Sequence, residues 1–181
     1  MQLDLVDLRA KELLPDLIDI LRLSKDSSVM KASDILSDWD CRASCDSIGA
    51  CVFYPFLDRY WQGKYMFEAL GDDLFKLLPL AAPGLNKFDL KTFIKEKSPW
   101  SDHRELLKKI VHREMCVVMD RLQESLGIEY SEWRLGDLHQ ISFWHRQRKK
   151  PGFEHLAVGP DPIGGSPTTL GMAVHMGKGP G

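Results

Sequence analysis

The chain has 181 residues, of which 44% are hydrophobic and 28% are charged, a composition typical of globular proteins. With 24 basic and 26 acidic residues the formal net charge is −2, so the chain lacks the positive excess with which proteins bind nucleic acid or an anionic membrane surface. No apolar run approaches the roughly 18 residues of a membrane span, and the acidic start MQLDLVDLRAKELLPDL lacks the basic and apolar regions of a signal peptide. We therefore expect neither nucleic acid nor a membrane among the partners.

The first predicted elements are helices. Apolar residues at helical spacing predict a helix over residues 5–23, and Pro15 should kink this helix or divide it into two, because proline removes a backbone hydrogen bond. Residues 24–28 contain capping side chains and should form a loop. A short helix is expected to follow over residues 29–39.

The stretch IGACVFYPFL is apolar almost all round and predicts a helix that is buried on most sides. Asp46 or Ser47 can cap its N-terminus, and the helix should extend to about Trp61 with a bend at Pro55. A further helix with one apolar face is expected over residues 67–78.

The clearest helical pattern lies in RELLKKIVHREMCVVMDRLQESLG, where apolar residues recur at steps of three or four. Ser101 or Asp102 can cap this helix, and Glu105 stands three residues after Asp102, which is the spacing of a capping box. Gly127 is a natural C-terminal stop. One long helix is therefore expected between these signals.

After the long helix the pattern changes to strands, which are expected over residues 141–145, 155–158 and 168–175. The basic run RQRKKPG at 146–152 is expected to be a solvated turn between two of them, with phosphate binding as the alternative. The fold class is therefore α+β, with a helical region followed by strands. The glycine-rich C-terminal stretch lacks a closing element, which suggests that the sequence is part of a longer polypeptide.

Four cysteines, at positions 41, 45, 51 and 116, are candidates for a metal site or a disulfide. The CRASC spacing of Cys41 and Cys45 lacks the second half of a zinc motif. Small buried thiols without a chemical role are the expected outcome, and a disulfide and a metal role remain as alternatives. The roles of Cys51 and Cys116 are left open in the same way.

The segment EWRLGDLHQISFWH, residues 132–145, concentrates aromatic and imidazole groups and could be a metal site, a catalytic site or a structural strand. If residues 139–145 form a strand, His139 and His145 share one face but lie about 20 Å apart, too far to bind one metal ion. No nucleophile motif places a serine beside either histidine. The rings, with that of Trp133, are therefore expected to be part-buried framework.

Four segments carry a resemblance to a known family. The first tract has the form W-x-W-G-x-x-H-x-x-x-F-x-H, matched here by Trp133, Gly136, His139, Phe143 and His145. The second has the form L-x-x-W-D…D-S-x-x-A, matched by Leu36, Trp39, Asp40, Asp46, Ser47 and Ala50. The N-terminal QLDLVDLRAKELLPDLIDIL and the downstream GPDPIGGSPTTL are similar to two further segments. Over about residues 2–170 the chain thus resembles the β-chain region of the penicillin acylase (penicillin amidase) family of N-terminal-nucleophile (Ntn) hydrolases.

Two positions depart from the family pattern, since Leu135 replaces the second tryptophan of the tract and Ser166 replaces an acidic residue that often follows the paired glycines. The resemblance implies that residues 1–128 form a helical region of the acylase β-chain. Residues 129–181 would then return to the sheet of an Ntn-type αββα architecture, apparently truncated at the C-terminus.

The resemblance also implies hydrolysis of linear amides, such as penicillins or acyl-homoserine lactones, by an N-terminal serine whose own α-amine serves as the base. The family's nucleophile, oxyanion asparagine and calcium ligands all precede the matched region, so the chain is expected to hold no catalytic residue, no metal and no cofactor. Its substrate-binding residues are unknown. The implied partners are the remainder of the same precursor and a small-molecule amide. Family members are often periplasmic or secreted, which leaves the compartment of this chain unknown.

Three hypotheses remain after these considerations. The chain could be an inert part of a penicillin-amidase-type hydrolase, a small helical domain that binds a partner or ligand without catalysis, or an independent hydrolase with a histidine-based site. Amide hydrolysis by the chain alone would favour the third hypothesis, and a soluble chain with a cooperative melt would favour the second. If the aromatic tract is framework, His145→Ala should impair folding of the full enzyme more than turnover per folded molecule.

Overall fold

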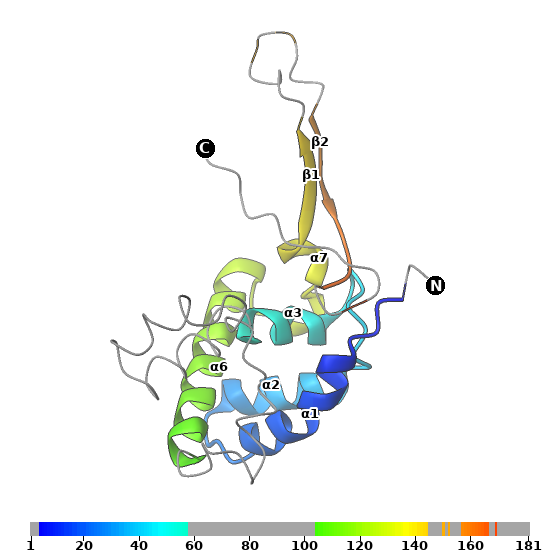
Figure 1. The fold of residues 1–181 in the computed structure, drawn as a ribbon. Helices are drawn as coiled ribbons and strands as arrows, with labels where there is room; N and C mark the ends of the chain where they lie inside the picture. The colour runs from blue at the N-terminus through cyan, green and yellow to red at the C-terminus, as the bar shows by residue number, and fades with distance from the viewer. Residues whose placement is uncertain are drawn as a thin grey trace, which may run out of the picture.

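The computed structural model describes residues 4–57, 104–144, 150, 152, 157–166 and 169. Within these ranges, helices pack into a body from which a two-stranded hairpin projects, with a short helix at the base of the hairpin (Figure 1). The predicted α+β class is therefore confirmed. No helix in the described ranges is both long enough and apolar enough to cross a membrane.

Helix α1 spans Leu8–Leu21 and begins where it does because the Asp7 carboxylate accepts the backbone N–H of Ala10, as an N-cap residue should. Pro15 lies inside this helix. The chain nevertheless forms one helix through the proline, so the predicted division into two helices does not occur. The buried face of α1 includes Leu13 and Leu17, which are fully inaccessible to solvent.

Helix α2 spans Ser27–Ser37 and starts two residues earlier than predicted. The reason is the cap: the carboxylate of Asp26 accepts the backbone N–H groups of Ser28 and Val29, which places both residues in the first turn. The expected loop is correspondingly shorter. Because α2 ends at Ser37, Trp39 lies outside the helix.

Helix α3 spans Ile48–Pro55, and of the two predicted caps Ser47 is the one used, since its hydroxyl accepts the N–H of Ala50. The helix is buried as predicted, with Val52 and Phe53 fully inaccessible. A π turn follows Pro55. The predicted continuation to Trp61 and the helix predicted over 67–78 lie outside the described residues.

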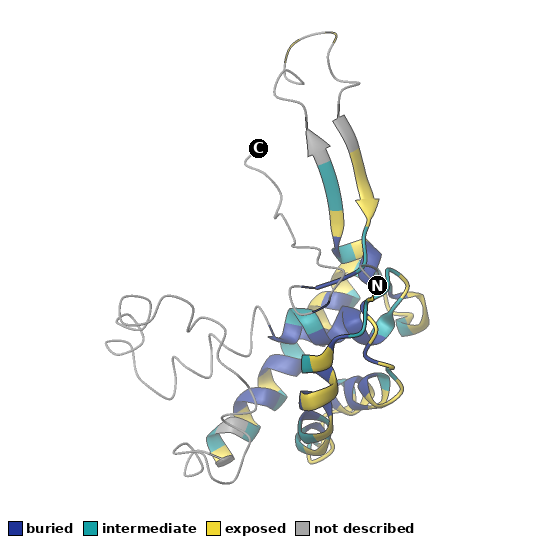
Figure 2. Ribbon diagram, turned by 45° about the vertical axis from the view of Figure 1, so that its right-hand side comes forward, coloured by how far each residue is buried: buried dark blue, intermediate teal, exposed yellow. Residues whose placement is uncertain are grey.

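Helix α6 spans Arg104–Leu126 and confirms the clearest sequence prediction. It packs against α1, α2 and α3, and buried residues lie where these helices face one another (Figure 2). Gly127 follows the last helical residue, and its φ of +95° is the left-handed conformation typical of the residue after a helix C-terminus. The caps predicted at Ser101 and Asp102 lie outside the described residues.

The segment after α6 is less extended than the sequence suggested. A 3₁₀ turn, η4 (Tyr130–Glu132), and a short helix, α7 (Leu135–Leu138), precede the strand β1, which spans only Gln140–Trp144. The aromatic segment is therefore not one extended strand from Trp133 onward, because its first half is helical and only the second half is a strand. The chain folds back here because Trp133 is fully buried in the helical core.

Strand β1 pairs in antiparallel fashion with β2, which spans Ala157–Pro162 rather than the predicted 155–158. Ile141 lies opposite Asp161 and Phe143 lies opposite Val158, so two residues of β2 face the single residue between them on β1. This is a β-bulge. The strand predicted over 168–175 and most of the turn predicted over 146–152 lie outside the described residues.

Candidate functional site

Residues 41–47, between α2 and α3, form a loop on which distant parts of the chain converge, and we call it the central loop. Its alternate carbonyl oxygens accept backbone N–H groups from three other segments. The donor and acceptor pairs are Asp7 to Cys41 (2.8 Å), Gly165 to Ala43 (2.7 Å), Gly136 to Cys45 (2.7 Å) and Leu135 to Ser47 (3.2 Å). The start of α1, the base of the hairpin and the glycine pair after β2 are thus joined through backbone alone.

The first residues of the central loop turn the chain and pair with the N-terminal segment. Cys41 has a φ of +62°, an uncommon left-handed conformation for a residue other than glycine, and turns the chain after α2. An isolated bridge between Val6 and Arg42 follows, in which Ala43 donates its N–H to Leu5 O at 2.8 Å. The loop thus begins with a single bridge and then forms a turn, in which Ser47 donates its N–H to Ser44 O at 3.1 Å.

Two glycines are required where the other segments meet the central loop. A Cβ atom on Gly136 would lie 2.8 Å from the Cβ of Pro162 and 3.3 Å from Cys45 O. A Cβ on Gly164 would lie 2.6 Å from Ala43 O. Neither a backbone carbonyl nor the ring-held Cβ of Pro162 can turn away as the end of a flexible side chain can, so glycine is required at both positions. Both glycines belong to the family-like segments identified in the sequence.

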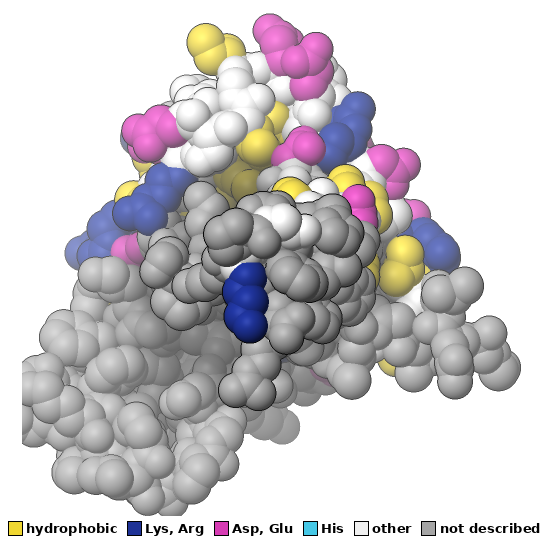
Figure 3. Space-filling view, turned by 90° about the horizontal axis from the view of Figure 1, so that it is seen from above, with side chains coloured by type: hydrophobic (Ala, Val, Ile, Leu, Met, Phe, Trp, Pro, Cys, Tyr) yellow, Lys and Arg dark blue, Asp and Glu magenta, His cyan; other side chains and the backbone are white. Residues whose placement is uncertain are grey.

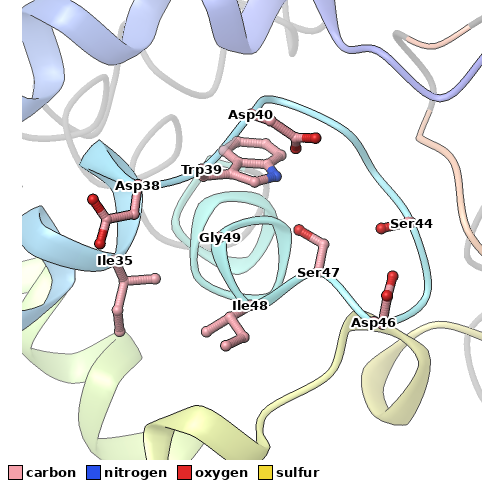
Figure 4. A pocket seen from close by; sticks show the side chains of 9 residues that line it. All are labelled: Ile35, Asp38, Trp39, Asp40, Ser44, Asp46, Ser47, Ile48 and Gly49. Atoms are coloured by element: carbon pink, nitrogen blue, oxygen red, sulfur yellow. The ribbon is translucent and has the colours of Figure 1, made fainter.

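Trp39 packs over the first turn of α3, directly beside Gly49 (Figure 4). A Cβ on Gly49 would lie 2.2 Å from Trp39 Cγ, so the indole occupies the space that any side chain would need. The indole Nε1 donates to Arg42 O at 3.0 Å, and the ring contacts Phe53 with centroids 5.3 Å apart. Trp39 thus fixes the central loop to α3.

The buried carboxylate of Asp7 links three elements by side-chain hydrogen bonds. Besides capping α1 through Ala10, it accepts the hydroxyl of Tyr54 in α3 at 2.8 Å and the hydroxyl of Ser166, after β2, at 3.1 Å. Several donors are what a fully buried carboxylate requires. Sequence reasoning did not single out Asp7, although an acidic residue before an apolar helical pattern is a recognisable cap signal.

A shallow pocket of about 510 Å³ lies beside the central loop (Figure 4). Its lining consists of Ile35, Asp38, Trp39, Asp40, Ser44, Asp46, Ser47, Ile48 and Gly49. The Ser44 hydroxyl, by hydrogen bonding to Asp46, holds the pKa of that carboxyl below its ordinary value. On the face of the molecule from which the hairpin projects, acidic and basic side chains are interspersed over the described surface (Figure 3).

The segments that meet at the central loop are those that carry the family-like motifs, and one family model matches residues 1–179 under the description penicillin amidase. The chain belongs to the penicillin amidase family. No curated protein matches the chain. The family resemblance seen in the sequence is confirmed, and membership places the chain among amidase-type hydrolases.

The aromatic and histidine positions of the penicillin amidase tract are distributed between core and hairpin. Trp133 is fully buried, donates from Nε1 to Gly127 O at 2.9 Å and packs edge-on against Tyr130. His139 is 8% exposed and lies at the end of α7. The burial of both rings and the bond from Trp133 to a backbone carbonyl agree with the sequence expectation, whereas His145 lies outside the described residues.

All four cysteines of this penicillin amidase chain are free thiols, so the disulfide alternative does not occur. Burial raises the pKa of the Cys51 thiol to about 12. It also raises the pKa of Cys41 and, together with the nearby Asp26 carboxylate, that of Cys116. Across the described ranges, no three histidine, cysteine or acidic side chains are grouped as metal ligands would be.

Proposed function

We propose that this chain is a framework part of a penicillin-amidase-type hydrolase and that the nucleophile lies on polypeptide outside it. Family membership supports amide hydrolysis as the reaction class. The observation that carries the framework role is the use of the motif residues: Ser47 caps α3, Trp39 bonds to Arg42 O, and Gly136 bonds to Cys45 O. These three residues thus hold segments of the chain together.

In the proposed reaction an N-terminal serine hydroxyl attacks the carbonyl carbon of a linear amide, and its own α-amine accepts the proton. The amine product leaves, and water then releases the carboxylic acid from the acyl-enzyme. This chain holds other parts of the enzyme in place and supplies no reacting group. Position matters because a displacement of about 1 Å in an active site can lower the rate on the order of a hundredfold.

The proposed partners are the remainder of the same precursor, comprising the α-chain and the rest of the β-chain, and a small-molecule amide substrate. No cofactor takes part in the proposed reaction. The central loop supports a structural role for this chain, because it joins the helical body to the base of the hairpin. It thereby fixes the orientation of the hairpin relative to the helical body.

The proposal can be tested by assaying the 181-residue chain with a panel of acyl 4-nitroanilides, alone and after mixing with the remainder of the precursor. We expect no release of nitroaniline by the chain alone and release by the mixture. The remainder alone is the matched control and should also be inactive. Turnover by the purified chain without its partner would contradict the proposal.

A further inference from the structure

The pocket beside the central loop is lined by acidic side chains that neither the fold nor the proposed reaction uses. Its volume is about 510 Å³, and its lining includes Asp38, Asp40 and Asp46 but no basic residue. All three aspartates are exposed, so their carboxylates are accessible from solvent. A pocket of this charge favours a cation.

Apolar side chains form another part of the pocket wall. Ile35, Ile48 and the indole of Trp39 line it together with the carboxylates (Figure 4). The indole Nε1 already donates to Arg42 O at 3.0 Å, so Trp39 offers ring surface to a ligand rather than a hydrogen bond. Aromatic and aliphatic surface beside carboxylates favours a cation that also carries hydrocarbon.

The arrangement of the carboxylates indicates what size of cation they suit. Asp38, Asp40 and Asp46 lie on different sides of the pocket (Figure 4). Within the described part of the chain, no three acidic, histidine or cysteine side chains are close enough to hold one metal ion together. Several ammonium groups joined by methylene chains match carboxylates that are spread in this way, because each ammonium group can pair with a different carboxylate.

Two positive groups near the pocket oppose the binding of a cation. The N-terminus of α3 carries roughly half an elementary charge. Arg134 is the other group: the pKa of Asp46 is lowered mainly by a hydrogen bond from Ser44 and to a smaller extent by the charge of Arg134. Arg134 does not line the pocket, and its Nη1 is held by Ser131 O and Trp133 O, both at 2.7 Å. The carboxylates therefore outweigh the two positive groups.

We infer that this pocket binds an aliphatic polyamine. The ammonium groups pair with the carboxylates, and the methylene groups between them lie on Trp39, Ile35 and Ile48. Charge complementarity selects a cation, the spread of the carboxylates selects more than one ammonium group, and the apolar wall selects the hydrocarbon. Binding at this pocket requires no part of the proposed reaction.

The test uses the linear triamine spermidine, added to the 181-residue chain at low ionic strength. Titration calorimetry should show saturable binding, and the indole N–H resonance of Trp39 should shift in the NMR spectrum. Asp38→Asn combined with Asp46→Asn removes two charges at nearly unchanged side-chain size and should weaken binding about tenfold. Glu124→Gln combined with Glu129→Gln removes the same charge at exposed positions outside the pocket. This pair is the matched control and should bind spermidine normally.

Other ligands supply a second measurement that does not depend on the folding of a variant. Butylamine, with a single ammonium group, should bind the wild-type chain more weakly than spermidine. A neutral diol of similar length should not shift the Trp39 resonance, because it brings no charge. Mg²⁺ at the same concentration should not displace spermidine, because the carboxylates are not grouped around one ion.

Four outcomes would overturn the inference. The first is the absence of saturable spermidine binding. Equal weakening by the two pairs of substitutions would mean that spermidine responds only to net charge. Displacement by Mg²⁺ would assign the pocket to small inorganic cations. Loss of spermidine binding when the remainder of the precursor is added would assign the pocket to the contact between the two polypeptides. The first three outcomes leave the proposed function intact, because that function is tested by nitroaniline release.

Discussion

Asp7 shows how one residue can join elements that are far apart in the sequence. Its carboxylate is fully buried, caps α1, and accepts hydroxyl groups from Tyr54 and Ser166. Removing it would leave one buried and one half-buried hydroxyl donor without this acceptor, and one helix without its cap. The cost of such losses depends on burial, because exposed groups can bond to water instead.

We predict that Asp7→Ala lowers the free energy of unfolding by about 3 kcal/mol, from the lost cap and the lost buried hydrogen bonds. Urea denaturation of the 181-residue chain measures this difference. Asp19→Ala, at an exposed position of the same helix, is the matched control and should change stability little. Equal effects of the two substitutions would show that the buried carboxylate has no special role.

Cys51 gives a prediction about pH. Its thiol is fully buried, and its pKa in the folded chain is raised from 9.0 to about 12. Above about pH 9 the unfolded chain therefore releases this proton while the folded chain still holds it. The stabilisation that Cys51 contributes is present below that pH and is lost as the pH rises toward the folded pKa.

The expected outcome is that the free energy of unfolding falls more steeply between about pH 9 and pH 11 in the wild type than in Cys51→Ala. Only the slopes are compared, because alanine also leaves a small cavity that lowers stability at every pH. Urea denaturation at several pH values measures both slopes. Parallel slopes would mean that the thiol titrates alike in the folded and unfolded chains.

At the scale of elements, the contact between Trp39 and α3 should make a glycine-to-alanine substitution in this helix destabilising, although such substitutions usually stabilise helices. Alanine in place of a helical glycine normally stabilises a protein by roughly 0.5–1 kcal/mol. At Gly49 the new Cβ would meet Trp39 Cγ at 2.2 Å and Trp39 Cβ at 2.3 Å, atoms too close to the backbone to swing away. The steric effect should therefore exceed the gain in helix propensity.

We predict that Gly49→Ala lowers the free energy of unfolding by about 2 kcal/mol, as overpacking in a buried site does. Gly127→Ala is the comparison, since its Cβ would meet nothing within 4 Å and only the φ of +95° opposes the substitution. Displacement of Trp39 should appear as a changed near-ultraviolet circular dichroism spectrum in Gly49→Ala alone. A stabilised Gly49→Ala variant would refute the packing described here.

The helices were predictable because their signals are local. Apolar periodicity located α1, α2, α3 and α6 to within a few residues, and Ser47 was among the two caps named for α3. The four residues of α7 are too few to show a helical period, so the sequence does not predict this short helix. The bulge was missed for a related reason: Gly159 marks it only once the register of β1 is known.

At the scale of the whole molecule, the sequence does not predict that distant segments meet at the central loop, although several loop residues belong to recognisable motifs. The motif glycines at 136 and 164 are visible in the sequence, whereas their partners are the carbonyl oxygens of Cys45 and Ala43, which every residue type possesses. Backbone hydrogen bonds between distant segments leave no side-chain pattern. The four motifs, which are separate in the sequence, therefore belong to segments that meet at one place in the fold.

This arrangement predicts that residues 163–166 can detach from the central loop while the helical core stays folded. A Cβ on Gly164 would lie 2.6 Å from Ala43 O and 3.4 Å from Cys45 N, so Gly164→Ala must push residues 163–166 off the loop. The bond from Gly165 N–H to Ala43 O and the bond from Ser166 to Asp7 should then be lost.

Amide hydrogen exchange tests this separation directly, because exchange reports local opening as well as global unfolding. In Gly164→Ala the Gly165 amide should exchange much faster, while amides of α6 such as that of Met115 keep their protection. Gly152→Ala, where a Cβ would meet nothing within 4 Å, should leave the Gly165 amide unchanged. Equal loss of protection at Gly165 and in α6 would mean that loop and helices unfold as one unit. In that case the hairpin could not shift on the helical body without unfolding it, and the central loop would be as rigid a support as the core itself.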